Sequence, residues 1–382
     1  MGGLPLDCFL RIGGGFTFCM ISLACHGQAV SGGTATPVQP APQPAPSGAV
    51  LAQSESDDVS GAAANSRIRL DVRVTDRSGS LISGLVPTDF TVLDNGQPVK
   101  IATFHAYSRS DQPPDPPVQV IVVFDTVNTD FSAVSYAREQ VESFLRRNGG
   151  HLTEPVTIVW LTANGFEGQI ASSLDGNALA AQIDATEGRL RPANRAQGAW
   201  GAIERFQFCL QKLNEMVQTL AGSPGRKLLI WAGPGWPTPE GPSISISSDG
   251  AAHLFSEIVH LSEALRDGHV TVYSISGGLP GPLTFFYQGY LKGIKKASQS
   301  EMPDLSLKVL AVQSGGLAMP PSNDVASSLD TCYRDADAFY SLSFDPSPTD
   351  SPDQFHKVEV RVDKPGLVAR TRTGYYDEPA GH

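Results

Sequence analysis

The sequence predicts an α/β protein. We expect a mostly parallel sheet with helices on both faces, inserted in or flanked by a small antiparallel β-sandwich formed by the N- and C-terminal strands. In the middle of the chain, continuous apolar runs alternate with helical patterns, which is typical of βαβ units around a parallel sheet. Near both ends, apolar and polar residues alternate with a period of two, which is typical of half-buried antiparallel strands. The few strands at each end would be marginal alone, so we expect them to pack together.

The first 29 residues are expected to be a signal peptide. A short apolar stretch at 13–25 follows Arg11 and precedes small residues at 27–29, which is the layout of a removable export signal. Lipid attachment at Cys25, or a retained anchor, are the alternatives. We therefore expect an exported protein, in the periplasm, in the cell envelope or secreted, and no transmembrane span in the mature chain.

Residues 30–64 are rich in proline, alanine and serine, which indicates a disordered, extended linker. An N-terminal β unit is expected at 65–110. Ile68, Leu70, Val72 and Val74 point to one side of its first strand, and Asp94-Asn95-Gly96 predicts a hairpin turn.

The α/β domain is expected at 117–330. Its buried strands are predicted at 118–124, 155–163, 226–233 and 269–276. Amphipathic helices are predicted after the first strand, around 200–220 and around 254–265, and a last helix capped by Asp304 and ended by Gly315-Gly316. At 335–378, alternating patterns predict C-terminal β strands that pack with the N-terminal unit.

Charge and cysteine content narrow the classes of function. The formal net charge is -11, and a nucleic-acid binder would need a basic surface, so we expect no nucleic-acid partner. Outside the expected signal peptide, Cys209 and Cys332 are the only cysteines. Two buried free thiols and one disulfide both remain open.

Asp125 is the first candidate for a functional residue. It ends the first buried strand, and open α/β sheets bind their ligands at the carboxyl ends of strands. A second candidate is formed by His253, Glu257 and His260, whose spacing would suit one face of a helix and either a zinc site or a solvated helix edge. The sequence has no G-x-S-x-G elbow and no Walker motif, so catalysis has little support.

The order of the stretches IVVFDTVNTDF, GRKLLIW, VTVYSIS and QSGG resembles a von Willebrand factor type A domain. Residues 66–378 as a whole resemble the bacterial VWFA-related domain proteins of acidobacterial type. The resemblance implies a Rossmann-like fold. It also implies a metal-ion-dependent adhesion site, in which an Asp-x-Ser-x-Ser motif, a loop threonine and a later aspartate hold a divalent cation.

This sequence departs from that motif, so we expect a degenerate site. Asp125 matches the first aspartate and Thr129 can replace the second serine, but Val127 stands in place of the first serine. Gly233 lies where the later aspartate is expected, and the loop near 194–202 has no threonine. Asn128 could add an amide oxygen or cap the following helix.

Two interpretations of this turn remain open. Asp125, Asn128 and Thr129 could hold Mg²⁺ or another divalent cation. Alternatively, Asp125 accepts hydrogen bonds from backbone amides at the strand-to-helix turn. No other cofactor is expected.

Two long loops at 235–250 and 277–290 are expected at the same sheet edge as Asp125 and carry the aromatic residues Trp236, Phe285, Phe286 and Tyr287. Aromatic residues on loops are typical anchors at interfaces, although such loops can also pack on themselves. We expect an exported, non-catalytic, adhesion-like protein that binds a protein or a cell-surface ligand. The alternatives are a structural scaffold of the cell envelope without a ligand site and, least favoured, a metal-dependent hydrolase.

Overall fold

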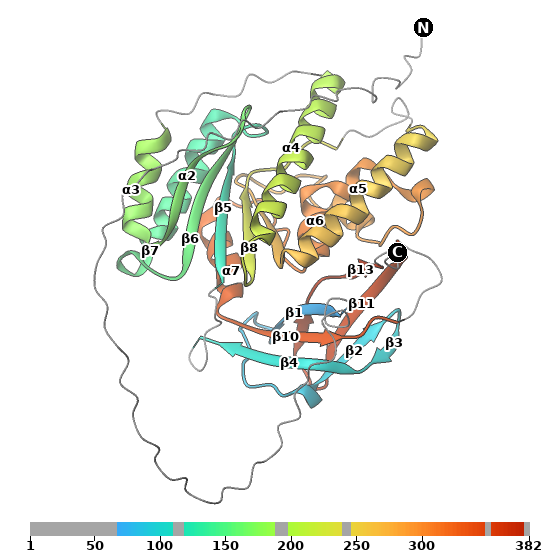
Figure 1. The fold of residues 1–382 in the computed structure, drawn as a ribbon. Coiled ribbons are helices and arrows are strands. Elements are labelled where there is room, and N and C mark those ends of the chain that lie inside the picture. Colours follow the sequence, from blue (N-terminus) through green and yellow to red (C-terminus); the bar gives the residue numbers. More distant parts are fainter. Residues whose placement is uncertain (1–66, 110–117, 188–197, 239–245, 348–352, 378–382) are drawn as a thin grey trace, which may run out of the picture. The chain divides into compact units, whose positions relative to one another are not determined.

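The computed structural model describes residues 67–109, 118–187, 198–238, 246–347 and 353–377. The expected signal peptide with Cys25, and the expected linker at 30–64, lie outside these residues. The described residues form one five-stranded sheet and two four-stranded antiparallel sheets (Figure 1). The predicted α/β class with a mixed, mostly parallel sheet is therefore confirmed.

The five-stranded sheet has the order β7-β6-β5-β8-β9. Its strands are β5 (Gln119–Asp125), β6 (His151–Thr162), β7 (Gly165–Asp175), β8 (Lys227–Ala232) and β9 (Val270–Ile275). All run parallel except β7, which pairs antiparallel with β6. Because β6 lies on one side of β5 and β8 on the other, the strand order reverses between β5 and β8. Open α/β sheets bind ligands at such a reversal.

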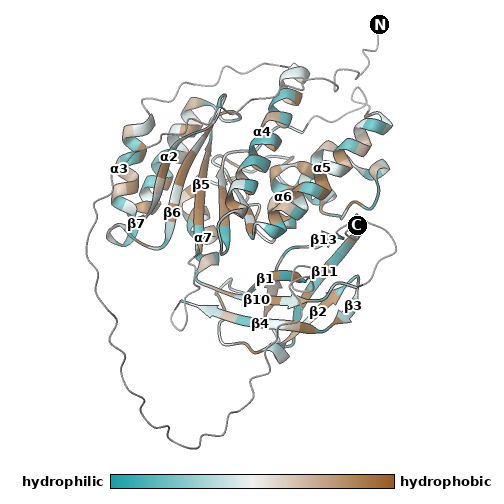
Figure 2. Cartoon of the chain, viewed as in Figure 1, coloured by the Kyte–Doolittle hydropathy of each residue, from teal (hydrophilic) through white to brown (hydrophobic). Residues whose placement is uncertain are grey.

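Helices cover both faces of this sheet, which is why its parallel strands are continuously apolar (Figure 2). Side chains of α2 (Phe131–Leu145), α3 (Gly176–Glu187) and α7 (Val325–Tyr333) share one hydrophobic core. Side chains of α4 (Gly198–Ala221), α5 (Ser248–Asp267) and α6 (Leu307–Gln313) share the other. Within β5, Val120 and Val122 face the first core, while Ile121 and Val123 face the second. No helix in the described part of the chain combines the length and apolar character needed to span a bilayer.

Strands from both ends of the described chain share the two antiparallel sheets. One sheet has the order β12-β1-β10-β4 and the other β13-β11-β2-β3. The bounds are β1 (Ile68–Thr75), β2 (Phe90–Asp94), β3 (Gln97–Val99), β4 (Ile101–Ser108), β10 (Ala338–Phe344), β11 (Phe355–Val362), β12 (Val368–Arg370) and β13 (Gly374–Tyr376). Ile68 pairs with Phe344, and Leu70, Val92, Leu342 and Val360 lie in one hydrophobic core.

The segment that carries the α/β elements begins after β4 and ends before β10, at adjacent positions in the antiparallel sheet. Ser108 at the end of β4 pairs with Ala338 at the start of β10. Next to this pair, the Arg109 amide donates to the Asp337 carbonyl at 3.0 Å. The two chain crossings are thus held side by side by backbone hydrogen bonds.

Short 3₁₀ helices complete the described structure: η1 (Pro87–Asp89), η2 (Arg147–Gly150), η3 (Phe286–Tyr290), η4 (Ala297–Gln299), η5 (Met302–Leu305) and η6 (Arg334–Ala336). The helix predicted to be capped by Asp304 starts later, at Leu307. Asp304 instead accepts a hydrogen bond from the Glu301 amide at 2.7 Å, within η5. The sequence pattern did not separate the 3₁₀ helix η5 from the α-helix that follows it, so the predicted start was too early.

A buried ionic cluster, which we call the Asp335 cluster, links β1 and β12 to the five-stranded sheet. Asp335 Oδ1 lies 3.2 Å from Arg73 Nη2, and its Oδ2 accepts hydrogen bonds from Tyr273 (2.7 Å) and from Arg370. Arg226 Nη1 donates to the Asp335 carbonyl at 2.8 Å. Burial raises the pKa of Asp335, but the guanidiniums of Arg73 and Arg370 outweigh it and hold that pKa below its ordinary value.

Candidate functional site

Asp125 occupies the position that the sequence predicted for it. It is the last residue of β5 and stands next to the end of β8, at the point where the strand order reverses. Its side chain is buried, with 1% of the residue exposed. A carboxyl group in this position needs a bound ligand, hydrogen bonds within the protein or a proton to offset its lost hydration.

The hydrogen bonds of Asp125 come from four N–H groups of the protein itself. Oδ1 accepts from the backbone amides of Val127 (3.0 Å) and Asn128 (2.9 Å). Oδ2 accepts from Asn128 Nδ2 (3.0 Å) and from the Trp231 indole (3.1 Å). Burial raises the pKa of Asp125, and the hydrogen bonds from Asn128 and Trp231 oppose this rise only in part.

The space in which an adhesion site would need its second aspartate is closed. A β-carbon placed on Gly233 would lie 2.7 Å from Asp125 Cβ and 3.2 Å from Thr129 Oγ1. Real β-carbons do not approach other atoms this closely, so a side chain at Gly233 would force β5 and β8 apart. The glycine is therefore required by packing at this sheet edge.

The remaining residues of the turn do not form a cation cage. Asn128 Oδ1 and Thr129 Oγ1 are buried and accept no hydrogen bond, but Val127 is a buried apolar residue of the core beneath α4 and α5. A divalent cation would need about six oxygen ligands, and the N–H groups around Asp125 would repel it. We conclude that these residues do not fit Mg²⁺. Across the described ranges, no group of three or more His, Cys, Asp or Glu side chains is placed to hold a metal ion.

We expect that millimolar Mg²⁺, Mn²⁺ or Ca²⁺ leaves the melting temperature of a protein of residues 31–382 unchanged relative to chelator. A cation at 100 times its dissociation constant would add about 2.7 kcal/mol to the free energy of unfolding. The measurement is a thermal melt with each ion, on the wild type and on Thr129→Val, which removes a candidate ligand. A rise of several degrees in the wild type that is absent in Thr129→Val would contradict this prediction.

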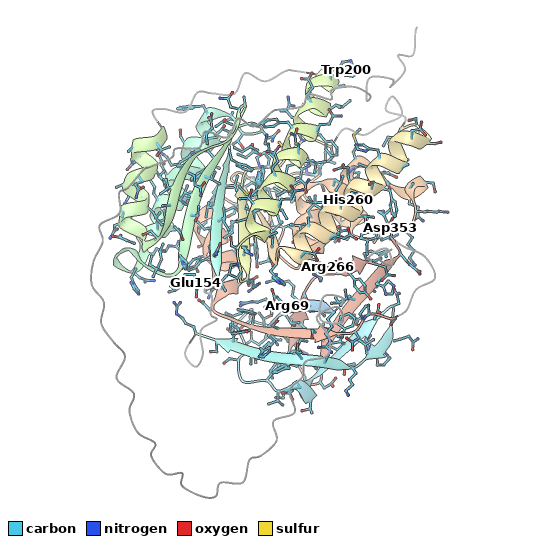
Figure 3. The ribbon with its side chains drawn as sticks, in the orientation of Figure 1. Arg69, Glu154, Trp200, His260, Arg266 and Asp353 are labelled. Carbon is cyan, nitrogen blue, oxygen red and sulfur yellow. The ribbon has the colours of Figure 1, made fainter. Side chains whose placement is uncertain are left out.

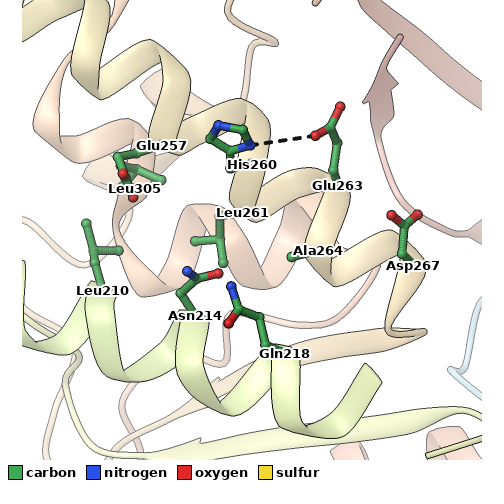
Figure 4. Close-up of a pocket in the computed structure, with 10 residues that line it drawn as sticks. All are labelled: Leu210, Asn214, Gln218, Glu257, His260, Leu261, Glu263, Ala264, Asp267 and Leu305. Atoms are coloured by element: carbon green, nitrogen blue, oxygen red, sulfur yellow. Dashed lines mark ion pairs between the residues drawn. The ribbon is translucent and has the colours of Figure 1, made fainter. Parts of the chain in front are cut away.

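The second sequence candidate lies on the solvent side of α5. The His253 side chain is 63% exposed and its Nε2 is 4.0 Å from Glu257 Oε1, while the 71% exposed His260 has Nδ1 3.9 Å from Glu263 Oε2. His260, Glu257, Glu263 and Asp267 line a groove of about 430 Å³ between α4 and α5 (Figure 4). The geometry supports a solvated helix edge.

Exposed apolar side chains gather at the edge where Asp125 lies. Nine large apolar side chains are exposed among the described residues, and six of them belong to segments at the carboxyl ends of the parallel strands. Phe131 is the first residue of α2, which follows β5, and Trp200 lies in the first turn of α4, which leads into β8 (Figure 3). The other four follow β9: Leu279, Leu283, Phe285 and Phe286. We call these six residues the apolar rim.

The prediction that Trp236 is one of four aromatic residues exposed for binding is wrong. Trp236 is 5% exposed, its indole donates to the Leu305 carbonyl at 2.9 Å, and its ring packs edge-on against Trp231 at 5.4 Å. It therefore belongs to the core, because a buried carbonyl satisfies its only polar atom. Phe285 and Phe286 are about half exposed, and Tyr287 is partly buried with Lys308 Nζ 5.9 Å from its ring centre.

Four members of the rim escaped the sequence analysis. Phe131 follows the N-cap Asp130 directly and is 69% exposed. Trp200 lies in the first turn of the amphipathic helix predicted around 200–220, and it is 67% exposed. Leu279 and Leu283 had no aromatic ring to draw attention to them.

The two cysteines of the described chain are free and buried. Cys209 Sγ lies 3.3 Å from Asn128 Nδ2, and burial raises the pKa of its thiol to about 12. Burial also raises the pKa of Cys332. Both thiols stay protonated at neutral pH and are shielded from substrates.

Comparison with protein-family models and with curated proteins gave no match for this chain.

Proposed function

We propose that this chain is an exported, non-catalytic binding protein that recognises a protein or cell-surface ligand through the carboxyl edge of a von Willebrand A-like domain. The observation that carries the proposal is the apolar rim, six exposed large side chains in segments that adjoin the carboxyl ends of the parallel strands. The resemblance in sequence and the mixed sheet with helices on both faces support the choice of domain.

The rim has the composition of a binding surface. Its side chains are between 49% and 78% exposed, and three of the six are phenylalanine and one is tryptophan. Exposed apolar groups that gather on one edge mark interaction sites more often than scattered ones do. Burying each such side chain contributes roughly 1.5–3 kcal/mol, so two or three of them would be enough to anchor a partner.

Recognition by this edge would be independent of metal ions. In adhesion sites of the type A family, the ion receives an acidic group of the ligand. Here the turn after β5 is held together by N–H donors to Asp125, so the turn supports the rim instead of binding an ion. The shielded thiols of Cys209 and Cys332 likewise support a role without catalysis.

We expect the double variant Phe131→Ser, Trp200→Ser to bind a cell-envelope fraction of the producing bacterium at least tenfold more weakly than the wild type. The reason is the loss of two exposed apolar anchors. The control is Val86→Ser, Val368→Ser, which removes two other exposed apolar side chains, 51% and 57% exposed, from the residue before η1 and from β12. Binding is measured by co-sedimentation at equal protein concentration. An equal loss in both variants, or no loss in the rim variant, would count against the proposal.

A further inference from the structure

We propose that residues 277–296, which we call the β9 loop, bind an anionic phospholipid surface. The inference rests on the proposed function and names the ligand class of one part of the rim. It is carried by three features of the loop: outward apolar side chains, the absence of carboxylates, and lysines that follow the apolar stretch.

The β9 loop holds its apolar residues outward. Leu279 and Leu283 are 78% and 76% exposed, and Phe285 and Phe286 are 51% and 49% exposed. By contrast, the polar Thr284 between them is buried, and its hydroxyl accepts a hydrogen bond from the Gly281 amide at 2.7 Å. This order is the reverse of an ordinary surface turn, where polar groups face water and apolar groups face the core.

Backbone hydrogen bonds fix this arrangement. The amide of Thr284 donates to Gly281, that of Phe286 to Leu283, and that of Gln288 to Phe285, at 3.0 to 3.1 Å. Below the turn, Lys308 Nζ donates to the Thr284 carbonyl at 3.4 Å. The exposed leucines and phenylalanines are thus presented on an ordered support and would lose little conformational entropy on binding.

The loop is basic in an acidic protein. Between Asp267 and Glu301 the sequence has no carboxylate side chain, although the whole chain has a net charge of -11. Lys292, Lys295 and Lys296 are all exposed. A negatively charged partner is therefore complementary to this segment and would be repelled by most of the remaining surface.

The exposed residue types of the loop favour a lipid surface over an acidic protein. Leucine and phenylalanine come first, the partly buried Tyr287 and Tyr290 follow, and the three lysines come last. These are the residue types of a membrane interface, in which apolar groups reach the acyl chains, aromatic residues lie at the boundary and lysines meet anionic headgroups. A protein interface would need more hydrogen-bonding side chains, and only Gln288 is exposed and polar between Leu279 and Tyr290.

The test uses the mature chain and protein-free vesicles of phosphatidylcholine, with or without about a third of phosphatidylglycerol. Binding is measured by co-sedimentation at low and high salt. We expect binding to the anionic vesicles that weakens with salt, and much weaker binding to the neutral ones. Phe285→Ser with Phe286→Ser should reduce binding to the anionic vesicles by more than tenfold. Lys292→Gln, Lys295→Gln and Lys296→Gln together should reduce it by roughly 100-fold.

Val86→Ser with Val368→Ser is the matched control and should bind as the wild type does. Absence of wild-type binding to anionic vesicles, or an equal loss in the control, would overturn the lipid inference. Binding to the cell-envelope fraction that is lost after protease treatment, without vesicle binding, would assign the loop to a protein ligand. That result would leave the proposed function in place, whereas failure of both vesicle and envelope binding would overturn both.

Discussion

Replacing Asp335 with alanine is expected to lower the free energy of unfolding by about 3–5 kcal/mol. The change leaves the guanidinium of Arg73, of which 2% of the side chain is exposed, without its carboxylate. Arg370 and Tyr273 lose a hydrogen-bond acceptor at the same time. Urea unfolding, followed by circular dichroism, measures the loss.

Asp345→Ala is the matched control, because Asp345 also pairs with an arginine of the N-terminal segment. Asp345 Oδ1 lies 2.9 Å from Arg67 Nε, but the two side chains are 69% and 41% exposed. Exposed ion pairs contribute about 0–1 kcal/mol. Should Asp335→Ala cost no more than Asp345→Ala, the Asp335 cluster would not be a principal link between the sheets.

The difference in stability between the wild type and Asp335→Ala is expected to depend on pH. The pKa of Asp335 is lower in the folded chain than its ordinary value of 3.8. The carboxylate therefore stabilises the fold fully above pH 3.8, and this contribution is lost as the pH falls through the folded pKa. We expect the difference in stability between the wild type and Asp335→Ala to shrink as the solution is acidified below about pH 4.

Replacing Asp125 with alanine is expected to cost about 3 kcal/mol in the presence of chelator. Four N–H groups, from Val127, Asn128 and Trp231, lose their acceptor in a buried site, and each unsatisfied donor costs roughly 1–3 kcal/mol, although these costs do not add fully. A carboxylate reserved for a metal ion would behave differently, because its removal in chelator would relieve a buried charge. Urea unfolding in chelator separates the two cases.

Asp130→Ala serves as the comparison for Asp125→Ala. Asp130 is an N-cap five residues later, where its side chain accepts a hydrogen bond from the Ala133 amide at 2.8 Å. Loss of an N-cap costs about 1 kcal/mol. A wild-type level of stability in Asp125→Ala would show that the four donors find other partners and that the turn does not depend on its carboxylate.

The parts of the fold that were predictable are those in which one periodicity persists. β5, β8 and β9 are buried along nearly their whole length, and β6 is buried from Ile158 to Leu161, so each strand contains a continuous apolar run. β7 escaped prediction because it lies at the edge of its sheet and buries only Gly165 and Ile170 along its 11 residues. α3 consists largely of small residues, and α7 is only nine residues long, so neither has a long apolar stripe.

At the candidate site, position along the sheet was predictable and side-chain direction was not. Asp125 was located because the end of a buried strand is visible in the sequence. Trp236 and Phe285 lie in irregular segments, where no hydrophobic periodicity predicts which side chains face the core. In the structure Trp236 is buried and Phe285 is exposed. The Asp335 cluster was invisible for another reason: Arg73 and Asp335 are 262 residues apart, and no local pattern records such a pairing.

The adjacent chain crossings at Arg109 and Asp337 have a consequence for the order of folding. For the outer strands to pair on their own, the chain would have to close a loop of roughly 230 residues, at an entropic cost of about 5 kcal/mol. The folded five-stranded sheet already brings the ends of that segment close, because the Gln119 amide donates to the Arg226 carbonyl and Arg226 Nη1 donates to the Asp335 carbonyl. Folding of the segment between the crossings thus lowers the entropic cost of pairing the strands outside it. We therefore expect the outer sheets to form after the five-stranded sheet.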